Sequence, residues 1–124
     1  TLADPFEAAA RHGAAVVKAL LDRGLWGGDG YHVFYNINFP ARPAAEVKGI
    51  RVVRQGLRPD GFKVEAQDSP SGRRFLWVRG VAQAVDTGPG TDVSANLAGY
   101  VSVTPMRADL TAHDLMADLE DRLA

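Results

Sequence analysis

The stretch 90–105 constrains the fold more than any other part of the sequence. Thr91 or Asp92 can cap a short helix, because a side-chain oxygen there accepts a backbone N–H that the first helical turn leaves unpaired. Gly99 supplies the left-handed residue that ends such a helix, and the residues after it alternate as a strand that we expect Pro105 to end. A short helix followed by a short strand needs neighbours on both pieces, so this stretch predicts the junction of an α/β fold.

A longer helix is predicted over residues 4–23. Asp4 can cap it, Pro5 suits the first helical position, and Glu7 stands where a capping-box side chain reaches back. Apolar residues, many of them Ala or Gly, then recur at helical spacing until Gly24. A helix with such small residues on its apolar face is expected to lie close against a sheet.

A second helix is predicted over residues 111–123, at the other end of the chain. The run 111–114 offers side chains that can cap it. Leu115, Leu119 and Leu123 follow at helical spacing and predict one buried line.

Two sheet strands are predicted, over residues 31–39 and 49–54. The first is apolar on both faces except at Asn36 and Asn38, a pattern that favours a buried strand and is typical of a parallel one. The second carries Arg51 and Arg54, which favour an edge position or a wet face.

A protruding β-hairpin is predicted over residues 62–79. Its turn is the run 68–72, Asp-Ser-Pro-Ser-Gly, and its second arm places Phe75 and Trp77 on one face. Because a two-stranded ribbon is only marginally stable alone in water, we expect this aromatic face to pack on another copy of the chain.

Composition excludes several classes of function. The net charge of −1 gives no reason to expect nucleic acid or an acidic membrane as partner. The charges are unevenly distributed, since residues 42–79 hold nine Lys and Arg while residues 80–124 hold two. Such an uneven distribution suits contact between subunits. Without cysteine there is no disulfide and no thiolate chemistry. No apolar run could cross a bilayer and no secretory signal is visible, so we expect a soluble, cytoplasmic chain that begins in mid-protein.

The residues that suggest chemistry mostly have simpler interpretations. The Gly-rich loop 87–91 precedes a helix as a phosphate loop would, but it lacks the Gly-Lys-Ser/Thr ending, and a tight turn with a cap is favoured. The histidines His12, His32 and His113 form no metal-binding pattern. Two arginine groups, Arg51/Arg54/Arg58 and Arg73/Arg74/Arg79, indicate an interface or a solvated ribbon.

Asn36 and Asn38 are the remaining candidates, as substrate-binding residues. Amides on an otherwise apolar strand need partners if they are buried. They could bond loops at the end of the sheet or contact a substrate directly, and the sequence leaves both open.

Four ordered blocks of the chain resemble the C-terminal half of the SurE family, the survival-protein nucleotidases: Tyr35–Pro40, Val47–Gly56, Gly90–Pro105 and Asp109–Thr111. The resemblance implies that residues 1–124 are the C-terminal segment of a single SurE-like domain. Its fold would be the C-terminal part of a Rossmann-type, three-layer α/β fold with a protruding hairpin and a C-terminal helix.

The resemblance also implies a function. SurE proteins are metal-dependent phosphatases that hydrolyse nucleoside 5′- and 3′-monophosphates. Their metal ligands belong to the N-terminal half and match no position here, so we assign no catalytic and no metal-binding residue, and expect Mg²⁺ or Mn²⁺ to bind outside this segment, which alone would be inactive. The family implies a homodimer or homotetramer in which the final helix docks on a partner subunit or is swapped with it. The alternative is a non-enzymatic oligomerisation or binding module that retains half of the fold.

Overall fold

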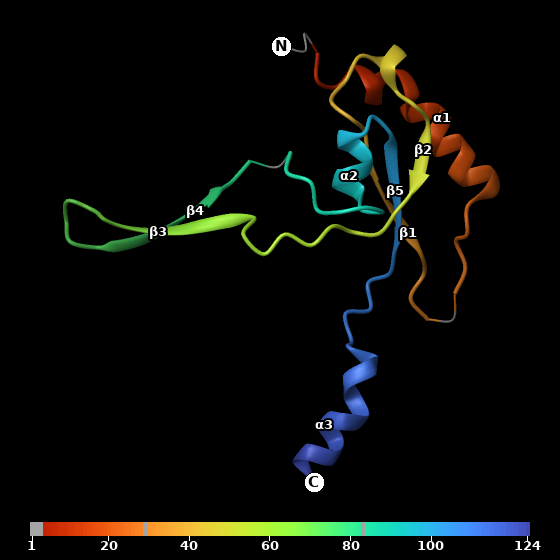
Figure 1. Ribbon diagram of the computed structural model, residues 1–124. Helices are drawn as coiled ribbons and strands as arrows, with labels where there is room; N and C mark the ends of the chain where they lie inside the picture. Colours follow the sequence, from red (N-terminus) through yellow and green to blue (C-terminus); the bar gives the residue numbers. More distant parts are fainter. Residues whose placement is uncertain (1–3, 29, 83) are drawn as a thin grey trace.

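A three-stranded sheet with a helix on each face forms the body of the protein (Figure 1). The computed structural model describes residues 4–28, 30–82 and 84–124. The strands are β1 (Phe34–Asn38), β5 (Val101–Met106) and β2 (Ile50–Val52), in the spatial order β1-β5-β2. This mixed arrangement of helices and strands confirms the α/β class predicted from the sequence.

The direction of β1 differs from the expectation. This strand pairs with β5 antiparallel, whereas β2 pairs with β5 in parallel. The apolar run arises because Tyr35, Ile37 and Phe39 pack toward the core, while Phe34 remains exposed. A run of apolar residues indicates burial on both faces, which is common in parallel strands but also occurs in antiparallel ones, so the expectation of a parallel strand was wrong for this pairing.

The core lies between β5 and the first helix, α1 (Glu7–Arg23). Val16 of α1 packs against Val101 and Val103 of β5, and Leu20 and Val47 are among the partly buried residues around them. Side chains alternate along a strand, so the residues between these valines face the other side of the sheet. Ser102 and Thr104 are buried there, beside α2 (Asp92–Leu97).

The N-terminus of α1 is built differently from the predicted capping box. The helix begins at Glu7, and Asp4 Oδ1 accepts a hydrogen bond from the backbone N–H of Phe6 at 2.8 Å. Glu7 Oε1 accepts from the N–H of Ala44 at 3.0 Å, in the short helix η1 (Ala44–Glu46). Glu7 therefore joins two elements instead of capping its own helix. Gly24 ends α1 as predicted, with its N–H bonded to the carbonyl of Leu20.

The junction 90–105 forms largely as predicted. Thr91 caps α2, since its Oγ1 accepts from the N–H of Ser94 at 3.3 Å, and Gly99 adopts a φ of +93° after the helix. Pro105, however, lies within β5 opposite Tyr35, and the strand continues to Met106. The missing N–H of proline would point to the edge of β5 that faces β2. It is tolerated because β2 pairs only with residues 101–103, so no ladder hydrogen bond is required at position 105 on that edge.

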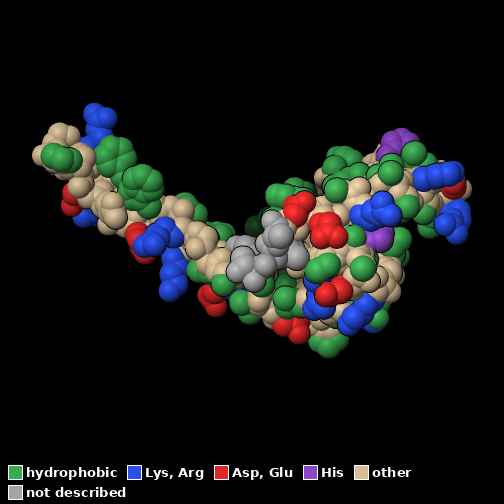
Figure 2. All heavy atoms as spheres, turned by 90° about the horizontal axis from the view of Figure 1, so that it is seen from above, with side chains coloured by type: hydrophobic (Ala, Val, Ile, Leu, Met, Phe, Trp, Pro, Cys, Tyr) green, Lys and Arg blue, Asp and Glu red, His purple; other side chains and the backbone are tan. Residues whose placement is uncertain are grey.

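The hairpin of β3 (Phe62–Asp68) and β4 (Arg74–Gly80) projects from the body (Figures 1 and 2). Hydrophobic side chains lie along the projecting ribbon in Figure 2, and Phe75 and Trp77 are 48% and 56% exposed. A salt bridge of 3.1 Å between Arg79 and Glu65 crosses its two strands.

The C-terminal helix α3 (Met116–Leu123), preceded by η2 (His113–Leu115), also extends away from the body (Figure 1). The predicted buried line is exposed within this chain: Leu115 by 57%, Leu119 by 54% and Leu123 by 78%. No side chain of the run 111–114 caps the helix. Asp109 instead accepts the N–H of Thr111 at 2.9 Å, and its Oδ2 lies 2.6 Å from Nε2 of His113.

Candidate functional site

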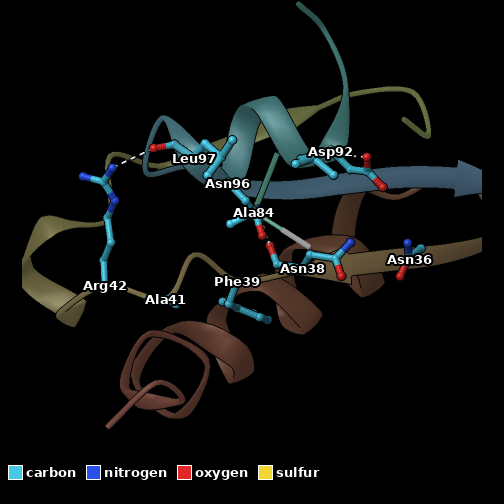
Figure 3. Close-up of a pocket in the computed structure, with 10 residues that line it drawn as sticks. Asn36, Asn38, Phe39, Ala41, Arg42, Ala84, Asp92, Asn96 and Leu97 are labelled. Atoms are coloured by element: carbon cyan, nitrogen blue, oxygen red, sulfur yellow. Dashed lines mark hydrogen bonds between the residues drawn. The ribbon is translucent and has the colours of Figure 1, made fainter. Parts of the chain in front are cut away.

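A cleft of about 540 Å³ opens between β1 and α2 (Figure 3). It lies where β1 ends and runs on into residues 39–42. Its volume falls in the range of small-molecule sites, and its walls combine apolar side chains with a few polar groups, as is typical of such sites. Among the lining residues are Asn36, Asn38, Ala41, Asp92, Asn96 and Leu97.

Asn96 fastens the helix to the sheet at the floor of the cleft. Its Nδ2 donates to the carbonyl of Asn38 at 3.1 Å, to the carbonyl of Tyr100 at 3.0 Å and to Oγ of Ser102 at 3.3 Å. One amide thus ties α2 to both β1 and β5. The sequence analysis did not identify this residue; the signal available was an amide between Ala95 and Leu97, on a helix expected to pack against a sheet.

Asp92 stands at the other end of α2. Its Oδ1 accepts from the N–H of Gly56 at 2.9 Å and from the N–H of Val93 at 2.8 Å. A side chain at position 56 would not fit, because a Cβ there would lie 2.4 Å from Oγ1 of Thr87 and 3.0 Å from Asp92 itself. Oδ2 of Asp92 has no hydrogen-bond partner among the described residues, so one carboxylate oxygen remains available beside the cleft.

Arg42 lines the cleft at the C-terminal end of α2. Its Nη2 donates to the carbonyl of Leu97 at 2.6 Å, a contact drawn in Figure 3. A cation at a helix C-terminus satisfies a carbonyl that the helix leaves unpaired and interacts favourably with the helix dipole. This contact uses one of the five N–H donors of the guanidinium.

The two amides singled out from the sequence, Asn36 and Asn38, come together on the β1 wall of this cleft (Figure 3). Neither side chain makes a hydrogen bond within the described part of the chain; Asn36 is exposed and Asn38 half-buried, so both amides are open to a ligand or to other parts of the protein. Thr104 lies directly opposite Asn36 in the sheet, and its buried Oγ1 also has no partner among the described residues.

The Gly-rich loop is a turn with a helix cap, as favoured from its sequence. Oγ1 of Thr87 donates to Oγ1 of Thr91 at 2.8 Å, and Oγ1 of Thr91 donates to the carbonyl of Gly88 at 2.7 Å. Gly88 and Gly90 take φ angles of +96° and +77°, which suit glycine. The hydroxyls and carbonyl of the loop therefore bond one another.

The histidines and arginines also occupy separate environments. Nε2 of His12 lies 2.9 Å from the carbonyl of Ala44, while His113 pairs with Asp109. The guanidinium of Arg51 stacks 3.7 Å above the ring of Tyr100.

Within residues 4–28, 30–82 and 84–124, no group of three or more His, Asp or Glu side chains could hold a metal ion. This donor set does not fit the divalent metal that the family resemblance implies.

Comparison with known proteins decides the family. The family model described as survival protein SurE matches residues 1–60. The 5′-nucleotidase SurE of Dinoroseobacter shibae is 64% identical over 125 residues, covering 100% of this chain and 48% of the relative. That of Cereibacter sphaeroides is 62% identical over 120 residues, covering 96% of this chain and 46% of the relative. The chain is a SurE-family sequence and corresponds to the C-terminal half of these proteins.

A solved SurE structure supports the same assignment. The crystal structure of the SurE protein from Aquifex aeolicus matches with a TM-score of 0.69 and 34% sequence identity, covering 96% of this chain and 46% of that one. The SurE resemblance and the α/β fold predicted from the sequence are confirmed. The chain spans about half the length of these SurE relatives. In the part of the chain that the structure describes, no helix has the length and apolar character needed to cross a bilayer.

Proposed function

We propose that the complete protein is a nucleotidase that hydrolyses nucleoside 5′- and 3′-monophosphates, and that this segment supplies scaffold and subunit contacts. The observation that carries the proposal is identity of 62% and 64%, along nearly all of this chain, to proteins named 5′-nucleotidase SurE. The reaction is hydrolysis of a phosphoric monoester, and we place it in the cytoplasm.

The proposal includes a divalent metal, Mg²⁺ or Mn²⁺, held by the part of the protein outside this segment. The described residues offer no cluster of three His, Asp or Glu side chains for such an ion. Hard divalent cations of this kind take oxygen ligands, usually from carboxylates together with the phosphate of the substrate. We therefore assign no metal-binding residue and no catalytic residue to this chain.

Subunit contacts are proposed for the two projecting parts. The hairpin exposes Phe75 and Trp77, while η2 exposes Leu115 and α3 exposes Leu119 and Leu123. Contiguous exposed apolar side chains of this kind mark interaction surfaces, and an isolated hairpin is marginally stable in water. A homodimer or homotetramer would cover these side chains, with α3 exchanged between protomers.

Release of phosphate from a nucleoside monophosphate tests the proposal. The full-length protein and this segment would each be assayed with Mg²⁺ or Mn²⁺, with a chelated sample as control. The expected result is metal-dependent release by the full-length protein alone. Release by neither would reject the nucleotidase and favour a non-enzymatic oligomerisation or binding module. Release by the isolated segment, whatever the full-length protein does, would show that the scaffold role proposed for the segment is wrong.

A further inference from the structure

We propose that the cleft between β1 and α2 binds the nucleoside part of the substrate and so contributes to substrate choice. This inference rests on the proposed nucleotidase function. It assigns a ligand to the two asparagines, Asn36 and Asn38, whose side chains line the cleft without a partner among the described residues.

The charges of the cleft favour a neutral group over a phosphate. Asp92 contributes a carboxylate with an available oxygen, which repels a phosphate dianion and can accept from a sugar hydroxyl. Arg42, the cation among the described lining residues, offsets this carboxylate and directs one N–H to the carbonyl of Leu97, so the cleft has no excess of positive charge for a phosphate. The reacting phosphate would therefore lie outside the cleft, where it meets groups supplied by the rest of the protein.

The side chains suit a flat, partly polar molecule. Each of Asn36 and Asn38 offers both donors and an acceptor, the combination needed to pair with the edge of a base or with ribose hydroxyls. Ala41, Val93 and Leu97 provide apolar surface against which a ring can pack. Asn96 and its three hydrogen bonds hold the two walls at a fixed separation before any ligand arrives.

The test compares two substrates of the full-length protein, a nucleoside 5′-monophosphate and p-nitrophenyl phosphate, which has a reacting phosphate ester but no nucleoside. Asn36→Ala and Asn38→Ala should each lower kcat/KM for the nucleotide about tenfold, mainly through KM, because each removes hydrogen bonds to the ligand. Hydrolysis of p-nitrophenyl phosphate should stay unchanged. Gln55→Ala is the matched control, since it removes an exposed amide outside the cleft.

A filling variant and a binding measurement complete the test. Ala41→Phe narrows the cleft from an exposed position, so it should raise KM for the nucleotide without unfolding the protein. Titration of the full-length protein with the four common ribonucleosides should show binding that Asn38→Ala and Ala41→Phe weaken.

Two outcomes would overturn the inference: equal losses on both substrates, or unchanged nucleotide kinetics together with no nucleoside binding. If the wild type hydrolysed neither ester, the proposed nucleotidase function would fail by itself. Nucleoside titration would still test whether the cleft binds a nucleoside in that case. Binding that the variants weaken would support the proposed site, and absence of binding would reject it.

Discussion

Substitution of Asn96 tests how the cleft is held together. Its amide donates to two backbone carbonyls at 3.0 and 3.1 Å and to a hydroxyl at 3.3 Å. Each of the two shorter bonds should contribute about 1 kcal/mol net, and the carbonyl of Tyr100 loses its partner from Asn96. Asn96→Ala should therefore lower the free energy of unfolding by about 2 to 3 kcal/mol.

Urea unfolding of the full-length protein, followed by tryptophan fluorescence, measures this loss. Asn96→Asp provides the sharper comparison, because it keeps the size of the side chain and replaces the donor with an acceptor that faces two backbone carbonyls. It should destabilise at least as much as Asn96→Ala. Gln55→Ala should change stability by less than about 0.5 kcal/mol, as is usual for surface positions. If Asn96→Asp were as stable as the wild type, the donor role of this amide would be refuted.

Three further outcomes follow from other parts of the chain. Deleting residues 63–79 should convert the oligomer to smaller species in light scattering, and an unchanged mass would count against the hairpin contact. Gly99→Ala should destabilise by about 1 to 2 kcal/mol in urea unfolding, because Gly99 has a φ of +93°; no change would contradict the left-handed requirement. The hydrogen bond from His113, with that from Thr111, lowers the pKa of Asp109 from 3.8 to about 2, so its contribution to stability is present above pH 3.8 and lost as pH falls through about 2. The stability difference between wild type and Asp109→Asn should shrink over that range, whereas a constant difference would argue against the pair.

Features decided by residues close together in sequence could be predicted. The cap at Thr91 and the left-handed Gly99 depend on a few neighbouring positions, and both occur as expected. The same holds for the alternation of β5, which places Val101 and Val103 in the core. Local stereochemistry can be predicted from the sequence because the interacting residues are only a few positions apart in the chain.

Features decided by distant partners could not be predicted. Glu7 bonds Ala44 instead of its own helix, and Asp92 accepts from the N–H of Gly56. The antiparallel pairing of β1 likewise depends on where β5 lies, which hydrophobic pattern alone does not specify. The cleft combines both kinds of information: Asn36 and Asn38 could be found on one strand, whereas Asp92 and Asn96 join them only through folding.

The leucines of α3 show a related limit. Their spacing predicted a helix with one apolar face, and the helix exists, yet that face is exposed within this chain. Periodicity identifies an apolar face but does not name what covers it. The proposed exchange between protomers would supply the missing surface.

Manganese binding tests the central claim, that the metal and the reacting phosphate are held outside these 124 residues. The full-length protein and this segment would each be titrated with Mn²⁺. The concentration of free Mn²⁺ would be measured by electron paramagnetic resonance. The account predicts that the full-length protein binds Mn²⁺ and the segment does not. Binding by the segment with the affinity of the full-length protein, or no binding by the full-length protein, would contradict it.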